Sequence, residues 1–230
     1  MESHWLQEKL QRALIVENGS DKIWLIEIDE FDTVWKDIYC WLPVHEKKKA
    51  SSIKIQSSKI RFIIRKGITR RILGDELGMQ PDAVPIQYNG KHKPYIFKSR
   101  CNFNISHSSK YLMVGITYRG EIGVDVQMIN MKKKCRFELV FSEHEVNEYK
   151  RMDYTEQELF FWKTFVVKEA VTKAMGDGMT VNFCDIEMMK QNHVTGNEVM
   201  FHYKKDVNIK AVINIAMTVD YAFAYVIVLP

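Results

Sequence analysis

The sequence predicts an α+β protein in which helices pack on antiparallel strands in each of two halves. Two long segments, residues 57–78 and 155–176, repeat apolar residues at helical spacing, and each ends at a glycine. Short runs of alternating apolar residues between turn signals surround both segments and predict strands. The turn at Arg119-Gly120 lies at the midpoint of the chain and is our predicted boundary between subdomains 1–118 and 119–230. No Pro/Gly/Ser linker joins them, so we expect the two to pack tightly.

The composition is that of a folded protein without a membrane segment. Of its 230 residues, 46% are hydrophobic and 12% aromatic, so the chain can bury a core and does not resemble a disordered protein. Charges follow Met1 too early for a secretory signal, and no apolar run reaches the roughly 18 residues of a spanning helix. The four cysteines are scattered, without a Cys-x-x-Cys pattern: Cys40, Cys101, Cys135 and Cys184. We expect free, buried thiols in a reducing cytoplasm and no zinc site.

The N-terminal half alternates strands with helices. Its main helix is expected to be capped by Ser57 or Ser58, to carry isoleucines every four residues from Ile60 to Ile72, and to end near Gly78. The other expected elements are a polar leader of residues 1–20 that can form one helix, a strand at 22–29, an ambiguous segment at 35–41, a helix at 43–54 opened by Pro43, a turn at Asn89-Gly90, and extended segments at 93–96, 102–106 and 111–118.

The C-terminal half is expected to hold two helices, each preceded by a capping-box pattern, within a set of strands. Ser142-x-x-Glu145 precedes a short helix, and Thr155-x-x-Glu158 opens the long one. The expected strands are 121–129, 181–189, 199–204, 209–218 and 221–228, with a hairpin turn at Thr195-Gly-Asn197.

Basic residues are concentrated near the N-terminus. Residues 1–110 contain 19 Lys and Arg against 13 Asp and Glu, whereas the whole chain has a net charge of only +4. Between Lys47 and Arg71 there are ten basic residues and no acidic one. This segment is either a solvated helical face or an anion-binding site, and the charge pattern alone leaves both open.

Two segments of the C-terminal half carry polar groups in a pattern that favours a functional site. Helical spacing puts Glu169 and Lys173 on one face of the long helix. Strand alternation puts Asp125 and Gln127 together, on the side opposite the apolar residues of their strand. An aspartate inside an apolar strand is costly unless a cation meets it. The structural alternatives are a surface ion pair for Glu169 and Lys173 and a loop-capping role for Asp125.

These segments resemble the motifs of a known enzyme family. Gly123-Val-Asp-Val126, followed downstream by Lys168-Glu-Ala-x-x-Lys173, resembles the signature pair of the 4′-phosphopantetheinyl transferases. Phe103-Asn-Ile-Ser-His-Ser108 resembles a third motif, found in the larger, Sfp-type branch. The similarity runs from about Ser57 to Met179. It implies two similar α/β subdomains with antiparallel strands and packed helices, related by a pseudo-twofold axis.

The resemblance also implies an activity, that of a holo-[carrier protein] synthase. Such an enzyme transfers 4′-phosphopantetheine from coenzyme A to a serine of an apo acyl or peptidyl carrier protein and releases 3′,5′-ADP. Mg²⁺ is the implied cofactor, for which Mn²⁺ can substitute, and coenzyme A is a substrate. The expected partner is the carrier protein, without nucleic acid or membrane, and a monomer is expected. Fatty-acid, polyketide and non-ribosomal peptide carriers remain equally open.

The resemblance assigns the catalytic residues by motif position. Asp125 and Glu169 match the metal-binding acids of the family, and Lys173 matches a lysine that contacts the phosphates. Glu169 is also a candidate general base for the carrier serine, directly or through a water. Gln127 stands where the Sfp branch often has an acid, so the third metal contact would be made by its amide, directly or through a water. Lys168 ranks below Lys173 because its adjacency to Glu169 points it elsewhere on the helix.

Other positions match the nucleotide side of the family's site. Ser106 and His107 match residues that contact phosphate, the histidine at the 3′-phosphate of coenzyme A. Arg61 matches an arginine at the same phosphate, and a guanidinium suits phosphate geometry. Lys93 matches a lysine that faces the nucleotide. Lys47 to Lys49 lie where the family has further lysines, in an uncertain register.

Two other functions compete with this interpretation. A relative that keeps the fold and the coenzyme A site but has lost transfer activity would carry the same motifs. Two positions depart from the family pattern: Gln127, and Phe165, which replaces a frequent tryptophan but keeps an aromatic side chain and should be tolerated. A nucleic-acid-binding protein could use the basic segment 47–71. That segment lacks interleaved aromatic residues, and the isoelectric point of the chain falls short of the usual basic footprint.

Overall fold

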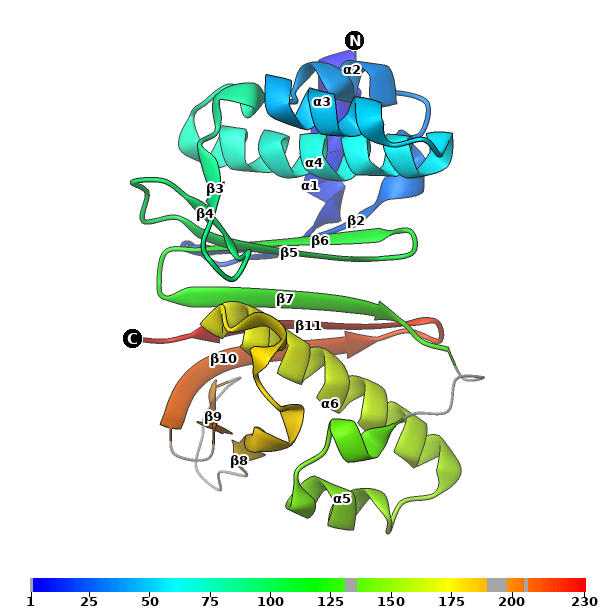
Figure 1. The fold of residues 1–230 in the computed structure, drawn as a ribbon, viewed down its shortest axis with the longest axis vertical. Helices are drawn as coiled ribbons and strands as arrows, with labels where there is room; N and C mark the ends of the chain where they lie inside the picture. The colour runs from blue at the N-terminus through cyan, green and yellow to red at the C-terminus, as the bar shows by residue number, and fades with distance from the viewer. Residues whose placement is uncertain (1, 131–135, 190–197, 205–206) are drawn as a thin grey trace.

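The structure is a computed structural model that describes residues 2–130, 136–189, 198–204 and 207–230 (Figure 1). The N-terminal half contains α1 (Glu2–Ala13), β1 (Leu14–Glu17), β2 (Asp21–Glu27), α2 (Trp35–Cys40), α3 (Val44–Ser52), α4 (Gln56–Leu77), β3 (Ile86–Tyr88), β4 (Pro94–Ile96), β5 (Asn102–Ser108) and β6 (Tyr111–Thr117). The C-terminal half contains β7 (Glu121–Met128), α5 (Glu143–Tyr149), α6 (Tyr154–Met175), β8 (Ile186–Met189), β9 (Glu198–Tyr203), β10 (Val207–Met217) and β11 (Tyr221–Val228).

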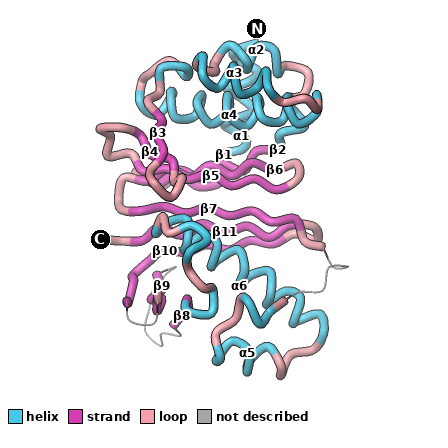
Figure 2. The backbone as a smooth tube through the Cα atoms, in the orientation of Figure 1, coloured by secondary structure: helices cyan, strands magenta, loops and turns pink. Residues whose placement is uncertain are grey.

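The elements form four layers, helices outside and two sheets between them (Figures 1 and 2). One sheet has the strand order β1-β2-β6-β5 and the other β7-β11-β10-β9-β8, while β3 and β4 form a separate two-stranded sheet. Every pairing of neighbouring strands is antiparallel. The predicted α+β class is confirmed. The predicted subdomain boundary falls in the turn between β6 and β7 and stays a prediction.

The long helix α4 covers the first sheet with an apolar side. Its isoleucines Ile63, Ile64 and Ile68 are fully buried in the core of the N-terminal half. The predicted serine cap is wrong: Ile55 precedes the first helical residue, and no side chain caps the helix. The predicted end is confirmed, since Gly78 adopts the left-handed conformation that a helix C-terminus favours.

In the C-terminal half, α6 covers the second sheet. Its capping box is formed by Asp153 and Glu156, so the box predicted at Thr155 and Glu158 is wrong by two positions. Aspartate is as good an N-cap as threonine, and its place in the extended backbone before the helix decides the start. The box predicted at Ser142 is confirmed for α5.

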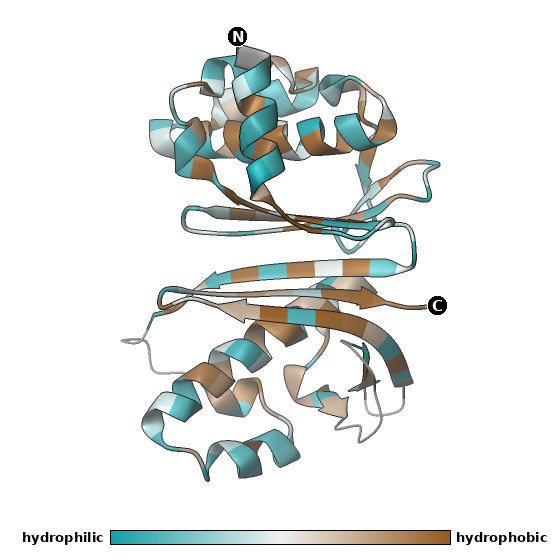
Figure 3. Ribbon diagram, turned by 180° about the vertical axis from the view of Figure 1, so that it is seen from behind, coloured by the Kyte–Doolittle hydropathy of each residue, from teal (hydrophilic) through white to brown (hydrophobic). Residues whose placement is uncertain are grey.

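The two sheets face each other across a third apolar cluster, visible as brown segments on both central layers in Figure 3. The buried members from β7 and β11 meet residues of β2 and β6; they are Ile23, Met113, Ile122, Val124, Val126, Tyr221, Phe223, Tyr225 and Ile227. Beside this cluster, β5 meets β7 through side chains. Oxygens of Asn104, Ser106 and Ser108 accept hydrogen bonds from alternate backbone amides of β7, those of residues 124, 126 and 128. We call these three bonds the β5–β7 seam.

A glycine lets β7 approach α6 closely. A Cβ atom added at Gly123 would lie 1.8 Å from the carbonyl oxygen of Ala170. No side chain fits there, so the motif glycine sets the distance between the strand and the helix. Asp125 follows Gly123 on the same face of the strand, which brings its carboxylate to the Glu169–Lys173 side of α6.

Several smaller expectations were resolved by the structure. The ambiguous segment 35–41 is mostly helix α2, and the leader ends in a strand, β1, in place of one continuous helix. Part of the strand expected at 181–189 is a short 3-10 turn, Phe183–Asp185, before β8. The hairpin turn predicted at residues 195–197 lies outside the described residues. Of the described cysteines, Cys101 is buried, but Cys40 is exposed, contrary to expectation; Cys135 is not among them.

Candidate active site

The three sequence motifs converge on one buried carboxylate. Asp125 of β7 is fully buried and accepts hydrogen bonds at Oδ1 from Nζ of Lys173 (2.6 Å) and Oγ of Ser106 (2.8 Å). Lys173 comes from α6 and Ser106 from β5, so each motif contributes one member. Nζ of Lys173 also donates to Oγ of Ser106 (2.9 Å). The ammonium supplies the cation that a buried aspartate needs.

Glu169 adds a second carboxylate to this cluster. It lies one helical turn before Lys173. Burial and, after it, the negative charge of Asp125 raise the pKa of Glu169, and Lys173 opposes them. A carboxylate with a raised pKa is a better proton acceptor, as a general base requires. Two carboxylates with only one ammonium between them also leave a net negative charge that suits a cation.

Gln127 points toward the same cluster, as strand alternation predicts. Its Nε2 donates to Oδ2 of Asp125 at 3.0 Å. Both oxygens of Asp125 are therefore engaged, one by Lys173 and Ser106 and the other by Gln127. Over the described ranges, no group of three or more His, Cys, Asp and Glu side chains could hold a metal by itself. Two acids would supply only part of a coordination shell, as for Mg²⁺, which keeps waters and takes substrate phosphates as ligands.

His107 lies in a positively charged environment at the edge of the cluster. Nη1 of Arg65, on α4, is 3.0 Å from Nδ1 and 3.2 Å from Nε2 of its ring. Partial burial and the charges of Arg65 and Lys173 lower the pKa of His107 to about 4. The imidazole is therefore neutral near pH 7 and able to accept a hydrogen bond. An anion placed here would meet the guanidinium and the Lys173 ammonium.

Arg61 is not brought to His107. Its guanidinium donates to the carbonyl oxygen of Ser109 and to Oδ1 of Asp29, each at 2.8 Å. Arg65, one turn further along α4, lies against His107, and the assignment of Arg61 to the 3′-phosphate stays a prediction. The same helical stripe contains both arginines, and the sequence offers no signal that separates them by one turn.

A cavity of about 280 Å³ opens beside the cluster, between α6 and the β3–β4 hairpin. Four lysines line it: Lys66, Lys91, Lys93 and Lys173. Lys93 crosses from the hairpin to donate to the carbonyl oxygen of Ala174 (2.6 Å) and to pair with Glu121. The cavity thus joins the Lys93 region to the Asp125 cluster. Lys47 to Lys49 do not line it, and Lys47 instead donates to the carbonyl oxygen of Cys40 (3.3 Å).

Lys168 has a structural environment. It is buried, pairs with Glu145 of α5, and donates to the carbonyl oxygens of Val140 (2.8 Å) and Phe183 (3.1 Å). Burial lowers its pKa. The lower rank given to Lys168 agrees with this placement, because its ammonium faces away from Glu169.

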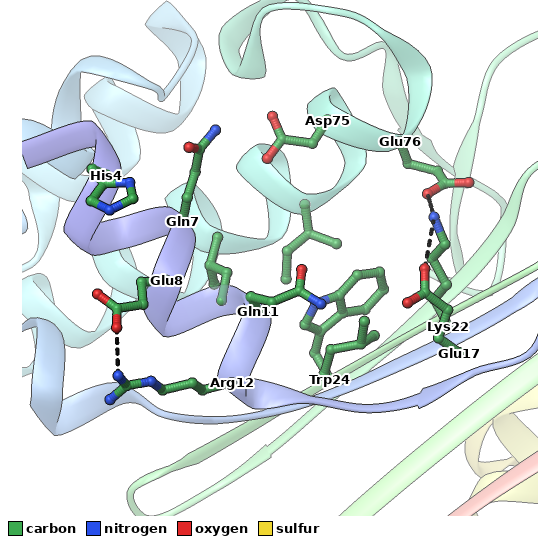
Figure 4. A pocket seen from close by; sticks show the side chains of 13 residues that line it. His4, Gln7, Glu8, Gln11, Arg12, Glu17, Lys22, Trp24, Asp75 and Glu76 are labelled. Atoms are coloured by element: carbon green, nitrogen blue, oxygen red, sulfur yellow. Dashed lines mark hydrogen bonds and ion pairs between the residues drawn. The ribbon is translucent and has the colours of Figure 1, made fainter.

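A larger cavity lies elsewhere. It measures about 740 Å³ and lies between α1, the first two strands and the end of α4 (Figure 4). Its acidic side chains are paired within the protein, as with Glu8 on Arg12 and Glu76 on Lys22. None of the residues predicted for the site lines it. The chemistry therefore points to the smaller, lysine-lined cavity.

Comparisons with known proteins agree with the sequence motifs. Residues 121–226 match the model of the 4′-phosphopantetheinyl transferase superfamily. The 4′-phosphopantetheinyl transferase HetI of a Nostoc species is 26% identical in an alignment over 183 residues that covers 76% of this chain and 76% of its own. A phosphopantetheinyl transferase of Xenopus laevis, named for L-aminoadipate-semialdehyde dehydrogenase, is 25% identical over 52% of this chain and 44% of its own.

Among solved structures, a holo-(acyl-carrier-protein) synthase from Bacillus anthracis in complex with coenzyme A is 25% identical, with a TM-score of 0.41. It aligns with 48% of this chain and 96% of that chain. Through its motifs and these matches, the chain is similar to 4′-phosphopantetheinyl transferases, with HetI of Nostoc and a putative transferase of Synechocystis among its relatives.

Proposed function

We propose that this enzyme transfers 4′-phosphopantetheine from coenzyme A to a serine of an apo carrier protein. The observation that carries the proposal is the convergence of Ser106, Asp125 and Lys173 beside a lysine-lined cavity. A pyrophosphate substrate needs cations for its phosphates and a base for the attacking hydroxyl. The cluster and the cavity together offer both.

In the proposed reaction, the carrier serine oxygen forms a bond to the phosphorus that carries the pantetheine. The bond between that phosphorus and the bridging oxygen breaks, and 3′,5′-ADP leaves. Glu169 takes the serine proton, directly or through a water, as its raised pKa permits. The ammonium of Lys173 balances charge on the phosphates. Ser106 and Asp125 hold that ammonium in place.

The two acids fit a hard divalent ion. Asp125 and Glu169 would hold Mg²⁺ or Mn²⁺, with Gln127 contacting the ion directly or through a water. When bound, the ion supplies positive charge to the pyrophosphate oxygens. The nucleotide side would use Lys93 and His107, with Arg65 in the role first given to Arg61. We propose a cytoplasmic monomer that serves an acyl or peptidyl carrier.

The deciding experiment is a mass measurement. Protein, Mg²⁺ and coenzyme A are incubated with apo carriers of the fatty-acid, polyketide and non-ribosomal peptide classes, and each carrier is weighed. We expect a phosphopantetheine adduct on at least one of them. If coenzyme A binds and no carrier gains mass, the protein is an inactive relative. If the protein binds no coenzyme A but retains a random oligonucleotide at physiological salt, it is a nucleic-acid-binding protein.

Replacing the proposed base tests its assignment. Glu169→Gln keeps the shape of the side chain but removes proton acceptance and a metal ligand, so the transfer rate should fall by about 10²–10⁴-fold. Glu8→Gln, an exposed glutamate on α1, is the matched control and should keep the wild-type rate. A Glu169→Gln rate above a tenth of wild type would show that Glu169 is not the base.

A further inference from the structure

The β3–β4 hairpin forms one wall of the proposed coenzyme A cavity. Its tip contributes Lys91, His92 and Lys93, whereas the opposite wall comes from α6 and the turn that follows it, including Gly176. The side chain of Asn89 shapes the tip, because its Oδ1 accepts hydrogen bonds from the amides of Lys91 and Lys93, both at 2.9 Å. The tip therefore has a defined shape, but this shape does not fix its distance from α6.

The N-terminal half holds the base of the hairpin, because Ile96 is buried in its core and Lys66 of α4 donates to the hydroxyl of Tyr88 (2.7 Å). Each of its strands has three residues, and the two pair only with each other. Tyr88, Tyr95 and Phe97, its large side chains, are exposed. A two-stranded hairpin of this size is marginally stable by itself. The position of the tip also depends on contacts that cross the cavity, and Lys93 makes one of them with the carbonyl oxygen of Ala174 (2.6 Å).

One carboxylate makes such a contact. Asp177 lies just after the C-terminus of α6, between Gly176 and Gly178, and both glycines have positive φ. It forms an ion pair with Lys91 at the hairpin tip. Its side chain is only 12% exposed, so solvent weakens this pair less than it weakens a surface pair.

The C-terminal half fixes Asp177 independently of the hairpin. Oδ2 of Asp177 accepts a hydrogen bond from the hydroxyl of Tyr203 (2.8 Å) and pairs with Lys204, at the end of β9. Hydrogen bonds from Lys204 and Lys91 lower the pKa of Asp177, which keeps it ionised at neutral pH. Asp177 is therefore an acceptor that the C-terminal half holds in place, and Lys91 is the more exposed member of the pair.

We infer that Asp177 is a positioning residue for coenzyme A recognition: it holds the hairpin tip through Lys91 and so sets the width of the nucleotide cavity. The inference rests on the proposed function. Neither Asp177 nor Lys91 is required to touch the reacting atoms, since Asp125, Glu169 and Lys173 are held by β7 and α6. Loss of the pair should affect binding of coenzyme A and leave the chemical step intact.

Steady-state kinetics distinguish an effect on coenzyme A binding, seen in its KM, from an effect on the chemical step, seen in kcat. Asp177→Asn should raise the KM for coenzyme A about tenfold, as expected for a charge-assisted contact, and leave kcat and the KM for the carrier within about twofold. Lys91→Met should do the same, and the double variant should be no worse than either single one, because both changes break one pair. Lys210→Met is the matched control: it removes a lysine that pairs with Glu198 on β9, outside the cavity, and should leave the KM within about twofold.

Hydrogen exchange on the ligand-free protein tests the same contact without activity. The amides of Asn89 and His92, which are bonded within the tip, should exchange faster in Asp177→Asn than in wild type. Three results would each overturn the inference. The first is a KM for coenzyme A that Asp177→Asn leaves unchanged, and the second is a double variant whose KM rises by the product of the two single effects. The third is an exchange rate of the tip amides that is the same in Asp177→Asn as in wild type. If the wild type transfers nothing, the proposed function fails, and the exchange result still decides whether Asp177 holds the hairpin. Lys91, half-exposed, gives a variant that should fold even if Asp177→Asn does not.

Discussion

At the scale of single residues, the candidate site is built around the carboxylate of Asp125, and hydrogen bonds from its neighbours offset the free-energy cost of burying it. Asp125 is removed from water, and each of its oxygens accepts from a neighbouring donor. Such a group is destabilising if it loses its cation, since an uncompensated charge then stays buried. Because a buried aspartate requires a cation, the sequence could predict that some cationic group meets Asp125. That this partner is Lys173 was not predicted, because the resemblance assigned that lysine to the phosphates.

Gln127 allows a prediction about the metal. Replacing Gln127 by Glu adds a third carboxylate beside Asp125 and Glu169, so the variant should need less Mg²⁺ than wild type for half-maximal rate. Without metal, the added charge repels Asp125, to which the amide now donates, so the metal-free variant should also be less stable.

Magnesium titrations of the rate, and of the thermal midpoint, measure both effects. Gln7→Glu adds the same charge on α1, far from the site, and should leave the magnesium requirement unchanged. A Gln127→Glu enzyme that needs as much magnesium as wild type, or more, would mean that residue 127 does not face the ion.

At the scale of elements, α4 shows how one basic segment divides into different roles. Arg70 is buried and binds Glu46, whereas Arg71 pairs with Asp75 on the surface. Arg61 is held by Asp29, and Arg65 reaches His107. The sequence could predict the helix and its apolar stripe, because these follow from periodicity. It could not assign the arginines, because their partners come from other elements.

The two arginines provide a matched pair of variants. Arg65→Ala should weaken coenzyme A by roughly 10- to 100-fold and dephospho-coenzyme A much less, because the lost charge-assisted bond would go to the 3′-phosphate. Arg61→Ala should discriminate less between the two ligands, since its guanidinium is already engaged by Asp29 and Ser109. Calorimetry of each variant with both ligands measures the ratio. A larger 3′-phosphate effect for Arg61→Ala would restore the assignment made from the resemblance.

The contact between β7 and α6 depends on one missing side chain. Gly123→Ala would place a methyl group against the carbonyl oxygen of Ala170, and neither backbone can yield without separating the strand from the helix. We expect a loss of about 1–3 kcal/mol or more in unfolding free energy, and a transfer rate that falls further as Asp125 leaves Lys173. Gly90→Ala is the control, because nothing lies within 4 Å of the added atom. Chemical denaturation of both variants decides it, and equal stabilities would disprove the close approach.

Local pattern explains which other elements could be predicted. Both long helices and most strands follow from periodicity and glycine stops. The start of α6 was missed because two acceptable capping boxes lie two residues apart, and sequence alone does not say which backbone is extended. The turn at Asn89-Gly90 and the extended segment 93–96 were predicted, but the pairing of β3 with β4 was not. The contact of this hairpin with Asp177 also escaped prediction, because an ion pair between residues 91 and 177 leaves no local signal.

At the scale of the whole molecule, the two halves share a core and a site. The apolar cluster between the sheets takes residues from both halves, and Ser106 from one half binds Asp125 from the other. None of the described helices combines the length and apolarity needed to cross a membrane. Because the β5–β7 seam and the cluster would both be exposed if the halves separated, neither half should be stable without the other.

This dependence predicts a single unfolding transition. Four of the five tryptophans, Trp5, Trp24, Trp35 and Trp41, lie in residues 1–118, so their fluorescence reports the N-terminal half. Hydrogen exchange of the β10 and β11 amides reports the C-terminal half. The native tryptophan fluorescence and the protection of these amides should be lost at the same denaturant concentration. Separating the sheets would expose residues such as Val124 and Val126, which are now fully buried. Val124→Ala should lower the stability of both halves equally, by roughly 1–3 kcal/mol for two lost methyl groups. Two resolved transitions would show that the halves are separate folding units and that the seam merely joins them.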